Sequence, residues 1–369
     1  MALVKPFRAL RYDARAAGRL DSLVAPPHDV IGAKARERLL AASPYNAVRL
    51  VRPDDVGEAA RLLREWRRAG LLVREERPAV WLLAEDFEAP DGSRRTRRGI
   101  VARVRLEPYE RGVVLPHERT FSRSKSRRLP LLRATRTKLS PVLFLHEGES
   151  PVPEGPPDVE ATLDGVTSRL WRVQDPEAVE CVLGLVRGRL LIADGHHRYE
   201  TALRFHAEDG SEETAYVLGA LVGRRDPGLV ILPTHRLAAS APAELDGGLQ
   251  RTDLAGVPEA LERLARLPRD RGAFVVLRPE GAALLEADRP LLDTAVVDSL
   301  PLHGVSYTAS AEEAERAVAS GAAEAAFLVR PPTIEQVEEF AGAGERMPPK
   351  STYFFPKLTS GLLFSPLDE

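Results

Sequence analysis

The chain has 369 residues, of which 44% are hydrophobic and 29% are charged, and its formal net charge at pH 7 is −2. This length allows two or three domains with proper cores, and the composition is typical of a soluble globular protein. The charge argues against a dedicated nucleic-acid binder, whose domain is usually strongly basic. A single cysteine excludes a disulfide framework, and no apolar run approaches membrane-spanning length. We therefore expect a cytoplasmic protein without a membrane partner.

Two prolines fix the backbone near the start of the chain. Pro26 and Pro27 hold it extended, so His28 and Asp29 take a fixed place in a turn before a helix predicted over residues 33–42. Two interpretations of Asp29 stay open: it caps that helix, or it belongs to a functional site. Further along, the patterns predict a strand at 45–51, an amphipathic helix at 56–69 and the two strands of a hairpin at 80–87 and 96–106.

A run of Arg and Lys side chains without any acidic residue extends over residues 119–138, directly after His117 and Glu118. It can be a loop and helix whose cations, Lys125 and Arg128 among them, reach nucleotide phosphates, or a nucleic-acid arm, or an exposed helix. The first interpretation is favoured because the segment has almost no aromatic side chains for base stacking. Nearby positive charge favours the ionised form of Glu118, which makes it a candidate magnesium ligand or general base.

A proline-rich loop at 150–157 separates the first part of the chain from the second. We predict three domains: an N-terminal α/β domain at 1–148 that carries the basic segment, a core at 158–240, and a C-terminal α/β region with a docked tail at 241–369. The strands predicted from residue 141 onward lie at 141–145, 165–173, 189–193, 215–222, 229–232, 273–277 and 325–329, and the helices at 177–186, 197–206, 257–267, 311–320 and 334–342.

The rest of the chain is organised around residues 189–205, with the sequence RLLIADGHHRYETALRF. An apolar run of strand length comes first, Asp194 and Gly195 break it, and helical spacing follows. The start of a helix exposes unpaired backbone N–H groups and the positive end of its dipole. His196, His197 and Arg198 add side-chain donors there, so we infer a corner that binds polyphosphate.

Two other interpretations of this corner are weaker. Asp194 can be a helix cap and Gly195 an ordinary turn residue with positive φ. A metal pair ranks third, because adjacent helical side chains point about 100° apart and His196 and His197 do not readily hold one ion together.

The tail at 346–358 combines lysines and hydroxyl groups with aromatic residues and prolines, which indicates a held loop. Either it is a strand docked by its aromatic side chains, or Lys350, Ser351 and Lys357 surround an anionic group.

The sequence D-G-H-H-R at 194–198, followed by Ala202, resembles the G-x-x-R-x-x-x-A box that holds nucleotide phosphates in the ParB/sulfiredoxin superfamily. This form of the box is similar to that of archaeal free-serine kinases. Over nearly its full length the chain resembles a bacterial family, domain of unknown function 1015, often labelled ParB-like. The pieces that carry this resemblance are residues 26–30, 117–118, 194–198 and 347–361.

The resemblance implies an α/β fold with mixed sheets, namely a ParB/sulfiredoxin-like nucleotide-binding core with an additional α/β C-terminal region. It implies a nucleotide-dependent phosphotransferase, a kinase whose acceptor is a small hydroxyl metabolite, with free L-serine first. ATP or ADP is the expected nucleotide, CTP is a further option, and Mg²⁺ is the expected metal. The alternative is a non-catalytic ParB-like switch that binds CTP or ATP. Sulfiredoxin chemistry is disfavoured because His196 stands where that chemistry needs a cysteine.

Phosphoryl transfer needs neutralisation of charge on the transferred group and a carboxylate that orients or deprotonates the acceptor hydroxyl. The catalytic candidates are Asp29, Glu118, Asp194 and His197, and the candidate magnesium ligands are Glu118 and Asp194. The predicted nucleotide-binding residues are His117, Lys125, Arg128, Gly195, His196, His197, Arg198, Lys350, Ser351 and Lys357.

Overall fold

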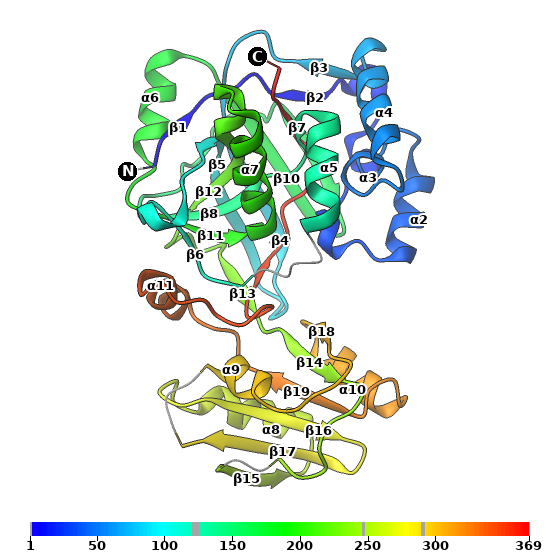
Figure 1. Cartoon of the computed structure of the whole chain (residues 1–369), viewed down its shortest axis with the longest axis vertical. Helices are drawn as coiled ribbons and strands as arrows, with labels where there is room; N and C mark the ends of the chain where they lie inside the picture. Colours follow the sequence, from blue (N-terminus) through cyan, green and yellow to red (C-terminus); the bar gives the residue numbers. More distant parts are fainter. Residues whose placement is uncertain (1, 120–124, 246–247, 289–291, 369) are drawn as a thin grey trace. The chain divides into compact units, whose positions relative to one another are not determined.

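The structure, a computed structural model, describes residues 2–119, 125–245, 248–288 and 292–368, without the side chains of residues 125–127 (Figure 1). The chain divides into two compact units. Unit 1 comprises Met1–Pro116, Thr120–Val230 and Pro356–Glu369, and unit 2 comprises His117–Arg119 and Ile231–Phe355. Both units combine helices with β-sheets, so the predicted mixed α/β class is correct. Among the described residues, no helix is long and apolar enough to cross a membrane.

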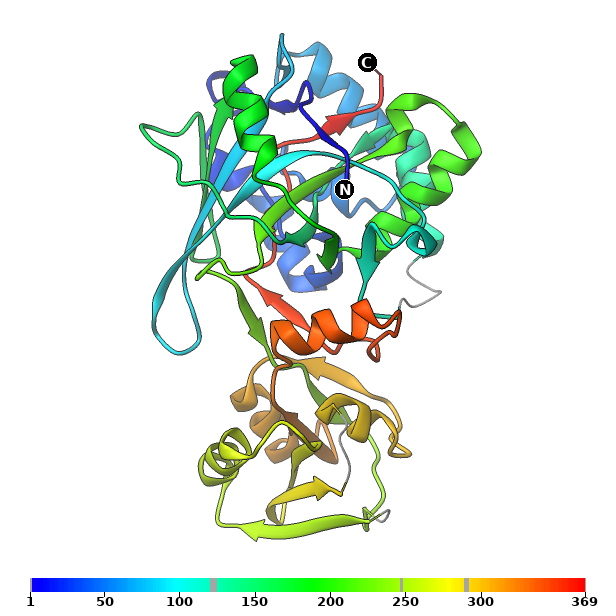
Figure 2. The same cartoon turned by 90° about the vertical axis from the view of Figure 1, so that its left-hand side faces the viewer.

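Unit 1 is built on a nine-stranded mixed sheet with the order β6–β11–β8–β12–β5–β4–β10–β9, and β1 pairs with β5. β12 runs parallel to β8, β8 antiparallel to β11, and β11 parallel to β6. Figure 2 shows the long antiparallel pair β4–β5 in cyan and light blue. The strands are β1 Val4–Lys5, β4 Val80–Glu88, β5 Arg94–Arg105, β6 Val114–Pro116, β8 Val142–His146, β9 Val159–Leu163, β10 Val166–Val173, β11 Leu190–Asp194 and β12 Tyr216–Gly223.

Helices α5 (Lys125–Thr135) and α7 (His196–Asp209) lie side by side over this sheet (Figure 1). Tyr199 and Ala202 of α7 are buried in the same apolar cluster as Phe144 of β8. A second cluster of unit 1 is enclosed by α2 (Ala33–Ala42), α3 (Val48–Val51) and α4 (Val56–Arg68). The remaining elements of unit 1 are the helices α1 Ala14–Ala17 and α6 Pro176–Gly184, the pair β2 Leu10–Tyr12 with β3 Leu72–Arg74, and the pair β7 Thr137–Lys138 with β21 Ser365–Pro366.

Unit 2 is built on a six-stranded sheet with the order β15–β17–β16–β19–β14–β18. Its central strand β16 is a continuous apolar run because both faces of the sheet are covered. Val275 packs with α8 and α10, whereas Phe274 packs with α9 on the other face. The elements are β14 His235–Ala238, β15 Leu249–Leu254, α8 Val257–Arg266, β16 Ala273–Arg278, β17 Gly281–Ala287, α9 Asp293–Asp298, β18 Ser306–Thr308, α10 Ala311–Ala319, β19 Ala325–Val329 and α11 Ile334–Gly342, together with the separate pair β13 Val230–Leu232 and β20 Tyr353–Phe355.

The strand predicted at 45–51 is wrong, because Val48–Val51 is the short helix α3. The side chain of Asn46 decides this local structure. Its Oδ1 accepts a hydrogen bond from the backbone N–H of Val48 at 2.8 Å, and its Nδ2 donates to the carbonyl of Val24 at 2.9 Å. This Asx turn bends the chain just before the helix, whose N-cap residue is Ala47, and burial explains the apolar run that suggested a strand.

The three predicted domains do not coincide with the two units. Strands β4 and β5 from the predicted N-terminal domain share one sheet with β10, β11 and β12 from the predicted core. The proline-rich loop at 150–157 therefore connects β8 to the edge strand β9 of the same sheet rather than two domains. The residues after 355 also return to unit 1.

Candidate functional site

The predicted strand, turn and helix around D-G-H-H-R are present as β11, Gly195 and α7. The pairing of β11 with β8 shifts register between Ile192 and Asp194, which marks an irregularity at the end of the strand. Gly195 precedes the helix with φ +96°, a left-handed conformation that side chains rarely adopt. A Cβ atom built there would lie 2.9 Å from Nε of Arg198. Glycine at this position therefore lets Arg198 fold back over the turn.

Asp194 is held by two cations. Arg198 donates from Nη2 to Asp194 Oδ2 and from Nη1 to the carbonyl of Pro141, and Lys357 Nζ lies 2.5 Å from Asp194 Oδ1. The three charged side chains are only 10–13% exposed. Because two positive charges share one negative charge in a place with little water, this group favours a further anion.

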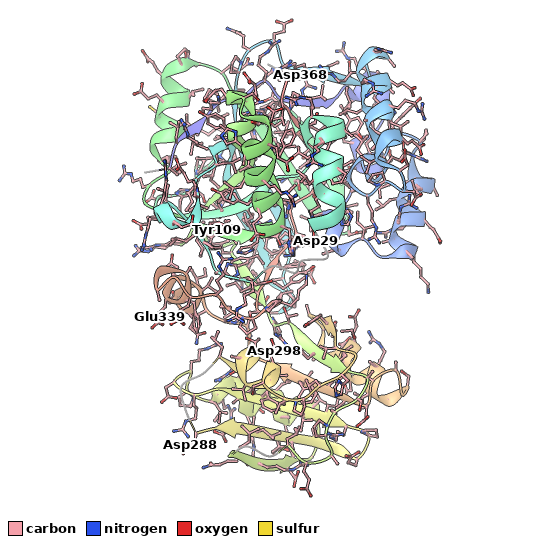
Figure 3. The ribbon with its side chains drawn as sticks, in the orientation of Figure 1. Asp29, Tyr109, Asp288, Asp298, Glu339 and Asp368 are labelled. Atoms are coloured by element: carbon pink, nitrogen blue, oxygen red, sulfur yellow. The ribbon has the colours of Figure 1, made fainter. Side chains whose placement is uncertain are left out.

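Asp29 lies against α5. The chain is extended at Pro27, with φ −65° and ψ 150°, and then enters a short 3-10 turn at His28–Val30. Asp29 Oδ1 is 3.4 Å from Nη2 of Arg128, so the carboxylate is brought to this helix; Figure 3 labels Asp29. The residue before helix α2 is Gly32, without a side-chain cap, so the interpretation of Asp29 as the cap of this helix is wrong.

The ionisation of Asp29 reflects opposing influences. Burial and the Asp194 carboxylate act to raise its pKa, but the positive charges of Arg198, Arg128 and Lys357 outweigh them, and the net pKa is lowered. Asp29 is therefore ionised at neutral pH and belongs electrostatically with Asp194. We call Asp29, Arg128, Asp194, Arg198 and Lys357 the charge cluster of unit 1.

The charge cluster has buried donors that remain unused. Within the described parts of the chain, Nε of Arg128 and Nε of Arg198 have no hydrogen-bond partner. Burial of a polar group without a partner costs free energy, so such donors favour an acceptor supplied by a ligand. His196 is buried and His197 is half-buried in the first turn of α7, next to Arg198 in the sequence.

A cavity of about 240 Å³ lies next to the charge cluster within unit 1. Arg128 and Arg198 line it, together with Lys138 of β7, which the sequence placed in the basic segment but did not single out as a site residue. Its short strand β7 pairs with β21, about 230 residues further along the chain, and no local sequence pattern could reveal that pairing. The remaining wall is mostly apolar, with Val51, Val56 and Leu131 among its residues.

The other predicted site residues form a separate group in unit 2. Glu118 Oε1 accepts the backbone N–H of Lys350 at 2.9 Å, and His117 Nε2 lies 2.9 Å from the hydroxyl of Thr352. The buried Ser351 hydroxyl donates to the carbonyl of Pro348 at 2.8 Å. Lys350 thus contacts Glu118 through its main chain, at φ +60°. The side chain of Lys125 lies outside the described residues.

The described residues contain no group of three His, Cys, Asp or Glu side chains that could hold a metal ion. Both oxygens of Asp194 already accept from cations. A magnesium ion at Asp194 would have to displace Arg198 or Lys357, and the predicted role of Asp194 as a magnesium ligand stays a prediction. Asp29 is more accessible, because its contact with Arg128 is long, at 3.4 Å, and its side chain is 32% exposed.

Three solved structures share a distant likeness with the chain. A free serine kinase in complex with AMP is 16% identical, with 69% of this chain and 86% of that one covered and a TM-score of 0.41. A conserved hypothetical protein from Pyrococcus furiosus is 16% identical (70% and 92% covered, TM-score 0.40), and SbnI with a C-terminal truncation from Staphylococcus aureus is 12% identical (72% and 87%, TM-score 0.39). With TM-scores below 0.5, these likenesses assign neither fold nor activity.

A search of the curated proteins finds no match to this sequence. The family described as "Protein of unknown function (DUF1015)" matches residues 4–302, which is most of the chain. The chain therefore belongs to the DUF1015 family.

Proposed function

We propose that this protein is a nucleotide-dependent phosphotransferase, a kinase that transfers a phosphoryl group from ATP or ADP to the hydroxyl of a small metabolite. Free L-serine is the first acceptor to test, because the D-G-H-H-R box resembles that of free-serine kinases. The observation that carries the proposal is the charge cluster, in which three cations and two carboxylates from separate parts of the sequence meet at the glycine turn before α7.

The cluster supplies the groups that phosphoryl transfer requires. Catalysis of this reaction depends mainly on positioning and on neutralising charge, rather than on covalent steps by the protein. Among the described residues, the buried Nε atoms of Arg128 and Arg198 have no hydrogen-bond partner and can donate to phosphate oxygens. The start of α7 adds backbone N–H groups, which are also donors. His196 and His197 add ring donors in the first turn.

Asp29 is our candidate for the carboxylate that orients the acceptor hydroxyl and takes its proton. Its lowered pKa keeps it ionised at neutral pH, which a general base requires. Asp194 acts as a positioning residue, since it holds Arg198 and Lys357 in place. Mg²⁺ would arrive with the nucleotide, bound chiefly by its phosphate oxygens, and would supply further neutralisation of phosphate charge. The roles predicted for Glu118, His117, Lys350 and Ser351 of unit 2 stay predictions.

The direct test is an incubation of the purified chain with L-serine, MgCl₂ and ATP, ADP or CTP, followed by ³¹P NMR. We expect O-phosphoserine with ATP or ADP, and loss of the product in Asp29→Asn and Arg198→Met. Arg204→Met is the matched control, because Arg204 lies on the same helix but is exposed and paired with Glu208. No phosphoserine from any donor would reject serine as acceptor. If the nucleotide binds but stays intact in the presence of a panel of hydroxyl metabolites, the kinase proposal is rejected in favour of a nucleotide-binding switch.

A further inference from the structure

Lys138 is a buried cation to which the described part of the chain offers no hydrogen-bond acceptor. The residue is 6% exposed, and among the described residues nothing accepts a hydrogen bond from its Nζ. Its Nζ lies over the ring of Phe205, 5.8 Å from the ring centroid. An ammonium group in this state costs the fold free energy, since it has lost its water and gained no counter-charge.

The charges around Lys138 do not relieve this cost. Arg103 is also buried, and it donates to the hydroxyl of Ser365 at 3.0 Å and to the carbonyl of Pro366. Its positive charge lowers the pKa of Lys138 further, after burial, which is the main cause; together they bring it to about 7. The other cations of the cavity wall, Arg128 and Arg198, already have the acidic partners Asp29 and Asp194.

This distribution of charge indicates a monoanion. Among the described cations that line the cavity, Lys138 is the one without a carboxylate partner, since Asp54, which also lines it, pairs with Arg36; one negative charge therefore balances Lys138. A carboxylate supplies one charge, whereas a phosphate monoester carries nearly two. The rest of the wall, with Val51, Val56 and Leu131, favours an apolar body behind that charge.

The cavity is partly open to solvent, so its volume sets the scale of the occupant rather than a strict limit. A cavity of about 240 Å³ corresponds to roughly eight water molecules at ~30 Å³ each, and therefore to about eight non-hydrogen atoms. We propose that this cavity binds a small monocarboxylate with an apolar chain of about five carbons behind the carboxylate, and that the carboxylate pairs with Lys138. Under the proposed function, an occupant of this kind that also carries a hydroxyl group would be the phosphoryl acceptor, but binding in the cavity can be tested without any transfer.

The test uses the sodium salts of straight-chain acids from acetate to octanoate, titrated into the full chain by calorimetry. These acids have no hydroxyl, so a failure of the kinase proposal leaves the result unaffected. We expect affinity to rise roughly four-fold per added CH₂ group, as burial of a methylene predicts, and to level off near hexanoate, which has eight non-hydrogen atoms. Affinity that does not depend on chain length, or no binding at all, would overturn the proposal.

Lys138→Met removes the charge at nearly constant volume and should weaken hexanoate binding at least ten-fold. Lys34→Met, at an exposed lysine of α2, should leave it unchanged. Should Lys138→Met not fold, the wild-type chain still gives an answer by trace acetylation of its lysines. Hexanoate should then protect Lys138 and not Lys34, and equal labelling of Lys138 with and without hexanoate would contradict the assignment.

Discussion

Lys357 reaches across 163 positions of sequence to place its Nζ 2.5 Å from Oδ1 of Asp194. This contact fixes the C-terminal segment to the end of β11, at the residue that precedes the glycine turn. Because Arg198 holds the second carboxylate oxygen, Asp194 is the anchor for both cations. The charge cluster therefore depends on the tail as much as on the D-G-H-H-R sequence.

Removing both Asp194 and Lys357 should lower the free energy of unfolding by less than the sum of the two single losses. Lys357→Met leaves Asp194 with Arg198 and should lower the free energy of unfolding by about 2 kcal/mol, whereas Asp194→Asn leaves two buried cations without a counter-charge and should cost about 3–5 kcal/mol. The double variant should lose at least ~1 kcal/mol less than the sum. Urea unfolding of all four proteins measures this coupling, and strictly additive losses would show that the pair does not interact.

Gly195→Ala should lower both the stability of the fold and the affinity for ATP, and a control variant separates the two effects. The new Cβ would meet Arg198 Nε, and a left-handed alanine costs about 1 kcal/mol. We expect at least a ten-fold loss of ATP affinity, measured by calorimetry. Gly210→Ala is the matched control at the other end of α7, because Gly210 also has a positive φ, +74°, but has open space around its Cβ position. It should lose similar stability and keep its ATP affinity; an equal loss of affinity would point to the helix rather than to Arg198.

Asp29→Asn should change the acid sensitivity of the protein. The folded-state pKa of Asp29 lies below the ordinary value of 3.8, so its ionised form stabilises the fold at neutral pH, and this contribution is lost as the pH falls through 3.8 and below. The wild type should therefore lose stability relative to Asp29→Asn on going from pH 6 to pH 3. The difference should stay within about 1 kcal/mol, because the carboxylate is partly exposed to water. Thermal unfolding at several pH values measures it, and a difference that stays constant with pH would show that Asp29 does not feel the cations.

Local sequence signals predicted the elements that carry the site. Helix α2 spans the predicted residues 33–42, and the turn at Gly195 lies between a strand and a helix as expected, since both depend on neighbours in the chain. The predicted strand at 45–51 failed because one side chain, Asn46, outweighed the apolar pattern around it.

Long-range pairing was beyond the sequence. The Asp164–Gly165 turn between β9 and β10 was a readable hairpin signal that our prediction did not use. The position of Lys138 in the cavity wall could not be predicted from the sequence. Its strand β7 is only two residues long and pairs with β21 at the far end of the chain. The separation of Glu118 from Asp194 into different units likewise depends on tertiary contacts that no spacing encodes.

Lys138→Met should be more stable than the wild type below pH 10, and the difference in stability should shrink as the pH rises. The pKa of Lys138 is lowered from 10.5 to about 7, so between these values the unfolded chain binds a proton that the folded chain does not. Stability of the wild type relative to Lys138→Met should therefore rise with pH across this window, by at most ~1.4 kcal/mol per pH unit. The cations that face Lys138 or share its cavity are Arg103, Arg128 and Arg198, which stay charged throughout, so they add no slope. Guanidinium unfolding of both proteins at pH 7, 8 and 9 gives the difference. A flat profile would mean that Lys138 titrates normally and that its ammonium is reached by water.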